Sequence, residues 1–505
     1  MNIAFRVDAS GQIGTGHFMR CLTLAENLHF KGVVIRFVSR HLPEYLREML
    51  FEKGYELILL NGAFSDSIKD DLPHSHWLEC SQQRDAQDSA QALSDRTWDW
   101  LIVDHYALDT RWESVMRQGV KKILVIDDIA DRQHDCELLL DQNFYTDMHA
   151  RYTGKVPAQC KLLIGPRYAL LREEFRLLRQ QLKPRTGPVK RIHVFFGGGD
   201  SYNYTEQTIN ALANLDMHEL HVDVVISAQH PFRQQIESAC CLHKFTCHIQ
   251  TDRIAVLIAE ADLAISAGGS TTWERCCLGL PTIAFSTADN QFRQINDAAA
   301  AGLLYAPEID GNFTTLLTRH LFALIKNNNL RELISSRAMV TVDGRGVLRI
   351  IRKMGCSGIK IRLATQDDSE KLFNWRNHPS IRYVSRHSGE ISWPDHQKWY
   401  SAVLFSSERV LLIGEFQERP VGVVRFDIEG NEAEVSIYIV PNINMPGIGQ
   451  DLLQSAEDWL VKFRPEIRKI NAEVLGDNAR SHHLFLEADY QVEQTSYSKS
   501  IYEQA

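Results

Sequence analysis

The chain has 505 residues and a formal net charge of −9. This length exceeds what one hydrophobic core usually serves, so we expect roughly two to four domains. The composition, 44% hydrophobic and 24% charged, is that of an ordinary globular protein, and the lack of a long basic run argues against nucleic acid as a main partner.

The first half alternates strand and helix patterns. Residues 3–7 are expected to form a strand, and residues 17–28 have the apolar spacing of a helix. Buried parallel strands are predicted at 33–40, 100–106 and 122–131. The last two end in polar residues, namely Asp104 and His105, and Asp127 and Asp128.

A glycine-rich turn, DASGQIGTGHFMRC (8–21), joins the first strand to the first helix. Glycine lets a backbone approach a ligand closely because it has no Cβ atom. His17 is expected in the first turn of the helix, at the carboxyl end of a strand, where open α/β sheets bind ligands. The spacing alone leaves a catalytic His17 and a capping His17 equally open. Asp8 could orient His17 or cap the loop.

A second series of strands follows a predicted linker at 183–191. Strands are expected within 191–200, 220–227, 245–250, 261–274 and 281–286. Glycine turns at Gly198-Gly199 and Gly268-Gly269-Ser270-Thr271 each follow a strand and precede a helix. Neither is a dinucleotide fingerprint, and tight packing also requires glycine. Since a helix N-terminus favours phosphate, the two turns together predict a nucleotide diphosphate in a cleft between two doubly wound halves.

The pattern becomes rich in strands from residue 359. A strand is expected at 359–365, a helix at 369–378, a hairpin within 409–430, a strand at 432–441 and a helix from 451 to about 463. We therefore divide the chain at 1–187, 188–355 and 356–505. The predicted fold class is α/β, with two Rossmann-like doubly wound domains in a GT-B-like arrangement, followed by an α+β domain.

Two segments of the first 350 residues resemble nucleotide-sugar enzymes. AGGSTTWERCCLGLPTIAF (267–285) resembles the donor-nucleotide segment of GT-B glycosyltransferases, which implies that Glu274 holds the ribose hydroxyls; an exposed helix carboxylate is the alternative. RVDASGQIGTGHFMRCLTLA, with VDHY and IDDIADRQHDCELLLDQN, resembles the UDP-sugar hydrolases of pseudaminic acid biosynthesis. That family removes UDP from a 2,4-diacetamido-2,4,6-trideoxy-β-L-altropyranose.

The hydrolase resemblance implies a catalytic His17. A neutral imidazole suits a base that orients water near neutral pH, and a helix N-terminus disfavours the imidazolium. The departing UDP would be stabilised by N–H groups at the second glycine turn, and a single displacement would invert the anomeric centre. The UDP-binding residues implied are Gly14, Gly16, Gly198, Gly199, Gly268, Gly269, Ser270, Thr271 and Glu274.

The last 150 or so residues resemble the GNAT acetyltransferases. NMPGIGQDLL (444–453) is similar to their acetyl-CoA pyrophosphate loop, and NARSHHLFLEADY (478–490) to their distal motif. Asn444, Phe485 and Asp489 depart from the usual residues, and Phe485 stands where a tyrosine often protonates the CoA thiolate. The implied acetyl-CoA-binding residues are Ile439, Val440, Asn444, Gly447, Ile448, Gly449, Gln450, Asn478 and Ser481.

WRNHPSIR (375–382) and ISWPDHQKWY (391–400) resemble the GNAT subgroup that acetylates a UDP-4-amino sugar, and also the ribosomal-type peptide acetyltransferases. Glu434, Ser436 or His396 could pass the proton of the amine to water. We therefore expect a bifunctional enzyme that acetylates the UDP-4-amino sugar and then hydrolyses the UDP bond. Two alternatives remain: a GT-B glycosyltransferase fused to an acetyltransferase of other specificity, and a nucleotide-sugar-binding regulator with a degenerate acetyl-CoA sensor.

The remaining expectations concern location and cofactors. No stretch approaches the roughly 18 uncharged apolar residues of a membrane helix, and the opening residues lack a signal-peptide pattern. The 10 cysteines include no Cys-x-x-Cys pair, which favours reduced thiols, and no ligand spacing is typical of zinc. We expect a cytoplasmic protein whose partners are UDP-sugars and acetyl-CoA, without a metal or a membrane; the sequence leaves the oligomeric state open.

Overall fold

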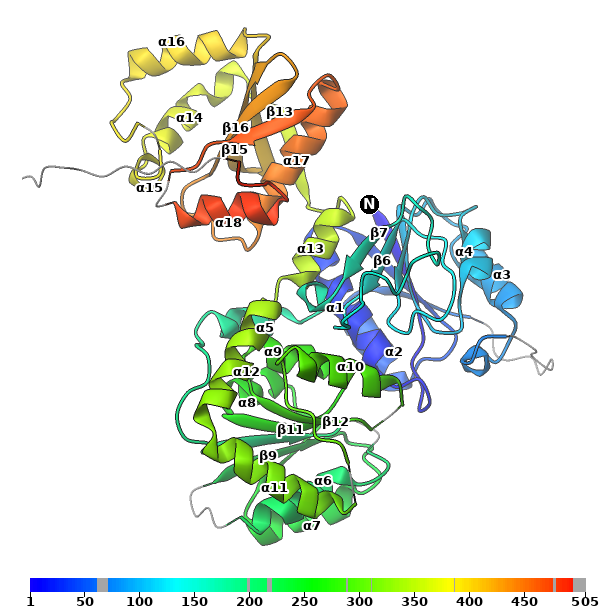
Figure 1. Cartoon of the computed structure of the whole chain (residues 1–505). Helices are drawn as coiled ribbons and strands as arrows, with labels where there is room; N and C mark the ends of the chain where they lie inside the picture. The colour runs from blue at the N-terminus through cyan, green and yellow to red at the C-terminus, as the bar shows by residue number, and fades with distance from the viewer. Residues whose placement is uncertain are drawn as a thin grey trace, which may run out of the picture. The chain divides into compact units, whose positions relative to one another are not determined.

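The computed structural model describes residues 1–60, 71–197, 200–215, 220–287, 289–309, 311–385, 387–475 and 478–493. They form two compact units, Met1–Ile350 and Ile351–Ala505, which we call unit 1 and unit 2. Unit 1 contains two parallel sheets, and unit 2 contains one mostly antiparallel sheet (Figure 1). The predicted fold class, two doubly wound α/β halves followed by an α+β domain, is confirmed.

The strand order of the first sheet of unit 1 reverses at β1: β2 and β3 are added on one side of it, and β4 to β7 on the other. Its strand order is β3-β2-β1-β4-β5-β6-β7, and neighbouring strands are parallel. The carboxyl ends of β1 and β4 therefore flank the crevice in which such sheets bind ligands. The strands are β1 Asn2–Val7, β2 Val34–Ser39, β3 Glu56–Leu59, β4 Trp100–Asp104, β5 Ile123–Ile126, β6 Leu138–Asp141 and β7 Lys161–Ile164. The helices are α1 Gly16–Phe30, α2 Glu44–Glu52, η1 Ser75–Trp77, α3 Gln82–Ala92, α4 Thr110–Met116 and η2 Pro166–Tyr168.

The second sheet of unit 1 has five strands and is also parallel, with a reversal in strand order. Its order is β10-β9-β8-β11-β12, again parallel, so the chain reverses between β8 and β11. The strands are β8 Arg191–Phe195, β9 His221–Ile226, β10 Thr246–Ile249, β11 Leu263–Ala267 and β12 Thr282–Phe285. The helices are α5 Glu173–Arg179, α6 Tyr204–Ala213, α7 Arg233–His243, α8 Ile254–Glu260, α9 Thr271–Cys277, α10 Asp289–Ala300, α11 Phe313–Lys326, α12 Asn328–Thr341 and α13 Gly346–Lys353.

Helices cover both faces of this second sheet, because successive residues of a strand point to opposite faces. Leu263 and Ile265 pack with α6, α7 and α11, whereas Ala264 packs with α8, α9 and α12. Phe175 of α5 joins the second of these clusters. Residues from about 169 onward thus pack with the second sheet, ahead of the linker expected at 183–191. The domain boundaries near 187 and 356 stay predictions.

Unit 2 is built on a five-stranded sheet of order β13-β14-β15-β16-β17. Its pairs are antiparallel except for β16 and β17, which are parallel. The strands are β13 Ile359–Leu363, β14 Arg409–Phe416, β15 Arg419–Glu429, β16 Glu432–Ile439 and β17 Lys469–Ala472. The helices are η3 Gln366–Asp368, α14 Ser369–Arg376, α15 Pro379–Arg382, α16 Trp393–Leu404, α17 Ile448–Phe463 and α18 Ala479–Glu487.

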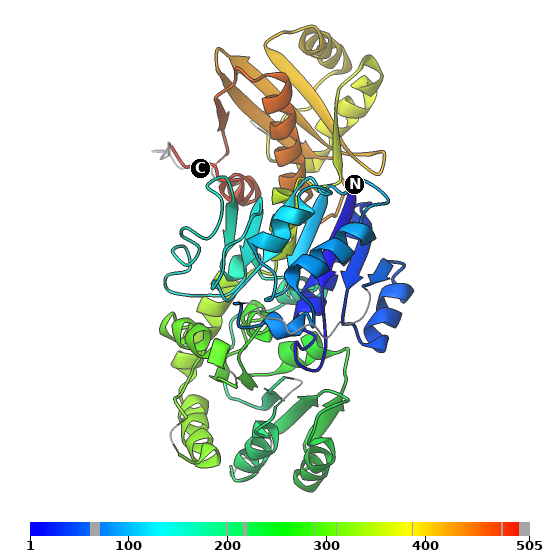
Figure 2. The same cartoon turned by 90° about the vertical axis from the view of Figure 1, so that its right-hand side faces the viewer.

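The two faces of this sheet have separate cores. Leu412 and Val424 pack against α17, which lies across one face in Figure 2, and Leu411 and Ile413 pack against α14 and α16 on the other. The period of two along β14 thus predicts which helix each side chain meets.

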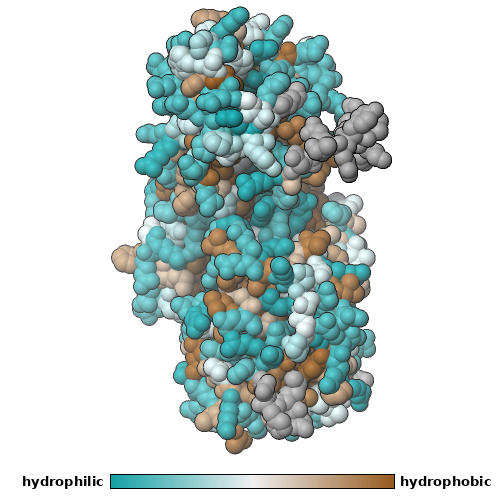
Figure 3. Space-filling view, turned by 90° about the vertical axis from the view of Figure 1, so that its left-hand side faces the viewer, coloured by the Kyte–Doolittle hydropathy of each residue, from teal (hydrophilic) through white to brown (hydrophobic). Residues whose placement is uncertain are grey.

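Among the helices that the structure describes, none combines the length and apolar character needed to cross a bilayer. On the face drawn in Figure 3, hydrophobic residues are scattered among hydrophilic ones.

Candidate active sites

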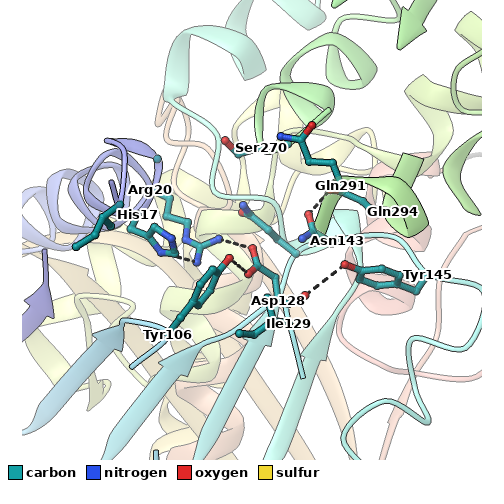
Figure 4. Close-up of a pocket in the computed structure, with 14 residues that line it drawn as sticks. His17, Arg20, Tyr106, Asp128, Ile129, Asn143, Tyr145, Ser270, Gln291 and Gln294 are labelled. Atoms are coloured by element: carbon teal, nitrogen blue, oxygen red, sulfur yellow. Dashed lines mark hydrogen bonds and ion pairs between the residues drawn. The ribbon is translucent and has the colours of Figure 1, made fainter. Parts of the chain in front are cut away.

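A cavity of about 240 Å³ in unit 1 lies at the carboxyl ends of the strands. Loops of both sheets line it, and Figure 4 shows their side chains converging. The lining residues are Ile13, Gly16, His17, Arg20, Tyr106, Asp128, Ile129, Gln142, Asn143, Tyr145, Gly269, Ser270, Gln291 and Gln294. The structure thus brings four of the predicted residues together, namely Gly16, His17, Gly269 and Ser270.

His17 is the second residue of α1, directly beyond β1. Its Nδ1 lies 2.6 Å from Oδ1 of Asp104, the last residue of β4. The two meet because β1 and β4 are neighbours in register, with Val7 paired to Asp104. Since an ionised carboxylate can only accept, Nδ1 carries a hydrogen, and in a neutral ring Nε2 is then the acceptor.

Arg20, one helical turn after His17, holds the other side of Asp104. Its Nε and Nη2 each lie 2.6 Å from a carboxylate oxygen of Asp104, and its Nη1 lies 2.9 Å from Asp128 Oδ2. Burial alone would raise the pKa of Asp104, but the charge of Arg20 and the hydrogen bonds from Arg20 and His17 hold that pKa well below its usual range. Asp104 therefore stays ionised and orients the imidazole rather than taking its proton.

Aromatic rings fix the other faces of His17. Tyr106 packs edge-on at 4.7 Å between ring centroids, and Trp77 stacks on Tyr106 at 5.3 Å. The hydroxyl of Tyr106 donates a hydrogen bond to Asp128. The ring of His17 is thus held on several sides, while its side chain keeps 10% of its surface exposed.

The expectation that Asp8 orients His17 is wrong. Asp8 is fully buried and accepts hydrogen bonds from Arg6 Nη1 and the backbone N–H of Arg40, both at 2.7 Å. His105 Nε2 lies 3.2 Å from its other oxygen. Asp8 therefore belongs to a cluster of buried charged residues beside β1. Asp104, on the adjacent strand β4, orients His17 in place of Asp8.

The other predicted residues of the glycine turns shape the site rather than line it. Gly14 has φ +75°, and its N–H donates to the Ser10 carbonyl at 2.8 Å, which closes the turn. A Cβ atom at Gly268 would lie 2.5 Å from Ile295 Cδ1, so this glycine serves packing. Thr271 begins α9, and its hydroxyl accepts from Arg275. Gly198 and Gly199 lie outside the described residues.

Glu274 lies on α9, one turn after Ser270, and outside the cavity lining. Its side chain is 17% exposed, and Arg172 Nη2 lies 3.7 Å from Oε1. Burial raises the pKa of Glu274 to about 7, against the weaker opposing charge of Arg172. Its role toward a ribose stays a prediction.

Several lining residues escaped sequence reasoning, among them Arg20, Asn143 and Gln294. Asp128, which lines the cavity, and Asp104, the partner of His17, had a usable signal, since both lie at the ends of predicted strands of one sheet. For Arg20, the only signal was its position three residues after His17 on the predicted helix, which places both side chains on one face.

A second cavity, of about 550 Å³, lies within unit 2 where β16 and β17 diverge. Their pairing runs only from Glu432↔Lys469 to Val435↔Ala472, and the residues beyond, 436–438 and 473–475, line the cavity. The N–H of Val440 donates to Val421 on β15. Because bonding directions alternate along a strand, the N–H of Ile439 points to the opened edge instead.

Of the predicted acetyl-CoA residues, Asn478 and Ser481 line this cavity, although Asn478 Oδ1 also caps α18 by accepting from Ser481 N at 3.1 Å. Gly447, with φ +74°, is the N-cap of α17, which begins at Ile448 rather than at the expected 451. Gly449 is the second residue of α17, and Asn444 is exposed in the preceding loop. The side chain of Gln450 accepts from Arg352 Nη2 at 3.0 Å, so only its backbone is available to the loop.

The candidate proton acceptors Glu434 and His396 both line the same cavity. His396 is only 2% exposed, and its Nε2 lies 2.9 Å from the carbonyl of Ser369, which requires a hydrogen on that nitrogen. Burial lowers the pKa of His396, so the ring is neutral, but the bonded Nε2 is no base. A relay through His396 would therefore have to use Nδ1, and its role stays a prediction. The role of Glu434 stays a prediction.

Four further residues of the cavity bear on its chemistry. Phe485 lines it and is 8% exposed. Burial raises the pKa of Tyr438 well above its usual range. The Nη1 of Arg376 is buried and has no hydrogen-bond partner within the described residues, while its Nη2 donates to the carbonyl of His387 at 3.1 Å. Arg425 lines the same cavity, where its guanidinium is paired with Asp427, and the carboxylates of Asp395, Glu434 and Glu473 line it as well.

A search of the described residues finds no group of three or more histidine, cysteine, aspartate or glutamate side chains placed to hold a metal ion. A mechanism without a metal stays a prediction.

Known proteins match the two units separately and together. Residues 370–490 match the model of the Acetyltransferase (GNAT) family. The UDP-2,4-diacetamido-2,4,6-trideoxy-beta-L-altropyranose hydrolase of Campylobacter jejuni is 25% identical over 281 residues, 55% of this chain and 89% of its own. The acetyltransferase PseH of the same species is 27% identical over 134 residues, 25% of this chain and 81% of its own. A protein of Methanocaldococcus jannaschii, described as uncharacterized, is 22% identical over 499 residues, 96% of both chains.

The resemblances inferred from the motifs are confirmed by these matches: the N-terminal region matches the hydrolase, and the C-terminal region matches GNAT acetyltransferases. At the level of families, the relatives support an enzyme that joins a nucleotide-sugar hydrolase type of unit to an acetyltransferase that uses acetyl-CoA.

Proposed function

We propose that this chain is a bifunctional enzyme of nucleotide-sugar metabolism. Unit 2 transfers an acetyl group from acetyl-CoA to the 4-amino group of a UDP-4-amino-4,6-dideoxy-N-acetyl-β-L-altrosamine. Unit 1 then hydrolyses the resulting UDP-2,4-diacetamido-2,4,6-trideoxy-β-L-altropyranose to the free sugar and UDP. The hydrolase of Campylobacter jejuni supports the substrate of unit 1, and the acetyltransferase of the same species supports acetyl transfer by unit 2. The observation that carries the proposed hydrolysis is that His17, paired with Asp104, lines one cavity with Gly269 and Ser270, which precede α9.

In the hydrolysis, His17 Nε2 accepts a proton from a water molecule as its oxygen attacks the anomeric carbon. The bond between that carbon and the phosphate oxygen breaks, and its electron pair leaves with UDP. Asp104 keeps Nδ1 protonated and stabilises the imidazolium that forms. The N–H groups of Gly269, Ser270 and Thr271 receive the departing charge, since those of Thr272 and Trp273 already donate to the carbonyls of Gly269 and Ser270. Attack opposite the leaving group inverts the anomeric centre.

In the acetyl transfer, the neutral amine attacks the thioester carbon, and the thiolate of CoA leaves and takes a proton. The pyrophosphate of CoA would lie on the N–H groups that open α17, beyond Gly447. Phe485 has no proton to give, but the hydroxyl of Tyr438 lines the cavity and stays protonated because burial raises its pKa. Arg376, whose Nη1 has no partner within the described residues, would attract the diphosphate of the amino-sugar substrate.

The test is to incubate the full chain with acetyl-CoA and the UDP-4-amino sugar, and to follow both products by NMR. We expect the acetylated UDP-sugar first, then UDP and the free sugar with inverted anomeric configuration. The variant His17→Ala should accumulate the acetylated UDP-sugar. Transfer of the sugar to an added acceptor in place of water would indicate a glycosyltransferase. Tight acetyl-CoA binding without turnover would indicate a sensor.

A further inference from the structure

Asn143 joins the two halves of unit 1 at the edge of the cavity. It follows β6 of the first sheet, and its backbone N–H donates to Asp141 Oδ1 at 3.0 Å. Its side-chain oxygen accepts two hydrogen bonds from the second half. The donors are Trp273 Nε1 of α9 at 3.0 Å and Gln294 Nε2 of α10 at 2.9 Å.

These two bonds fix which way the amide of Asn143 faces. The indole N–H of Trp273 can only donate, so the atom 3.0 Å from it must be the oxygen of Asn143 and not its nitrogen. The NH₂ group of Asn143 therefore points away from Trp273 and Gln294. The residue is 7% exposed, and within the described ranges its Nδ2 makes no hydrogen bond. Two unused donor hydrogens are thus held in one orientation at the cavity wall.

The donor lies close to the start of α9. Asn143 and Ser270 line the same cavity, and Trp273, which Asn143 contacts directly, is three residues after Ser270. Figure 4 shows Asn143 between Gln294 on one side and Asp128 and Arg20 on the other. Arg20 already donates to Asp104 and Asp128, so Asn143 and the start of α9 are the better donors for an incoming anion.

We propose that Asn143 donates a hydrogen bond from Nδ2 to an oxygen of the phosphate that leaves with the nucleotide, and that Trp273 and Gln294 hold it in position. This inference rests on the proposed hydrolysis, because it names a contact within that site. A preset amide costs no reorganisation when charge develops on the leaving oxygen. Trp273 is fully buried and outside the lining, so it acts only through Asn143.

The test compares Asn143→Asp with Asn143→Ala. An aspartate keeps an oxygen for both donors and so preserves the link between the halves, but it presents a second oxygen to the phosphate. We expect Asn143→Ala to lower kcat/KM for UDP release by about 10²–10³-fold and to weaken UDP binding at least tenfold. Asn143→Asp should lower both kcat/KM for UDP release and UDP affinity at least as much as Asn143→Ala does. Trp273→Phe, which keeps most of the ring and loses the N–H, should lower kcat about three- to tenfold with little change in KM.

The matched control is Asn210→Ala, the same change at an exposed position of α6, which should leave kcat/KM and UDP binding unchanged. Thermal melting of each variant verifies folding. Wild-type behaviour of Asn143→Asp would mean that Asn143 only links the halves, and would overturn the inference. So would loss of turnover in Asn143→Ala at unchanged UDP affinity. If wild-type enzyme bound UDP but released none from the UDP-sugar, the proposed hydrolysis would fail, and the UDP affinities would still decide the Asn143 contact.

Discussion

At the scale of single residues, His17 has one nitrogen available to a ligand, because Asp104 occupies the other at 2.6 Å. Asp104→Asn keeps the size of the side chain but removes the charge that fixes the imidazole tautomer and that binds Arg20. We expect kcat for UDP release to fall by about 10²–10⁴-fold while the UDP dissociation constant changes only a few-fold. Asp99→Asn, just before the start of the same strand, is the control and should retain full activity. A variant Asp104→Asn with near wild-type kcat would remove the pair from the mechanism.

A second prediction at this scale concerns Glu274, whose pKa burial raises from its usual value of 4.5 to about 7. The folded chain therefore holds this proton more tightly than the unfolded chain, and ionising Glu274 costs stability as the pH rises from about 4.5 through 7. Glu274→Gln should raise the free energy of unfolding at pH 8 by about 1–3 kcal/mol, with no gain near pH 4.

The same variant tests the predicted ribose contact. If Glu274 holds the ribose hydroxyls, Glu274→Gln should weaken UDP binding by about 1 kcal/mol or more in calorimetry at pH 8. The control Glu332→Gln, at an exposed position of α12, should change neither stability nor affinity. Stability gained at pH 8 without loss of UDP affinity would make Glu274 a buried structural carboxyl and nothing more.

Single residues also mark the limit of what the sequence predicts about the site. His17, Gly269 and Ser270 were predictable because glycine turns after strands place residues at one sheet edge. The residue that pairs with His17 was not predictable, because Asp8 and Asp104 both lie at strand ends close to the helix that carries His17. Only the strand order, with β4 beside β1, places Asp104 at the imidazole and leaves Asp8 to Arg6.

At the scale of elements, the strands missed by the sequence analysis, β3, β6, β7 and β17, are all four residues long. Length alone does not explain these misses, since β5, β10 and β12 are equally short and were predicted. A run such as LLLD of β6 shows no alternation and could as well belong to a buried helix. Longer strands such as β1, β2 and β15 were found from their apolar pattern. The parallel pairing of β16 with β17, which opens the cavity of unit 2, depends on the missed strand and was beyond sequence reasoning.

The start of α17 gives the prediction at this scale. Gly447→Trp places a large side chain, in a left-handed backbone conformation, where the CoA pyrophosphate would lie. Acetyl transfer should drop below detection, while hydrolysis of supplied diacetamido substrate stays within a few-fold of wild type. Gly430→Trp is the matched control, since Gly430 has φ +62° in the turn between β15 and β16 with open space around it. Equal loss of acetyl transfer in both variants would point to strain rather than to a blocked site.

At the scale of the whole molecule, the two cavities are each lined by residues of one unit only. Helix α13 spans the boundary at Ile350, and its Arg352 bonds to Gln450 and Asp451 within unit 2. We therefore predict that residues 1–355 hydrolyse the diacetamido substrate alone, and that residues 351–505 acetylate the amino precursor alone. A fragment 357–505, which lacks Arg352, should acetylate as well but melt at a lower temperature, because Asp451 is 1% exposed and loses a charged partner.

Each fragment is assayed with its own substrate, by UDP release and by loss of acetyl-CoA, and compared with the full chain at equal concentration. The rates should agree within a few-fold, because no described residue of one cavity comes from the other unit. Two folded but inactive fragments that recover both activities on mixing would show that the sites share residues across the boundary. Full activity in each fragment, with a faster overall conversion by the intact chain, would instead mean that fusion speeds transfer of the acetylated sugar between two independent sites.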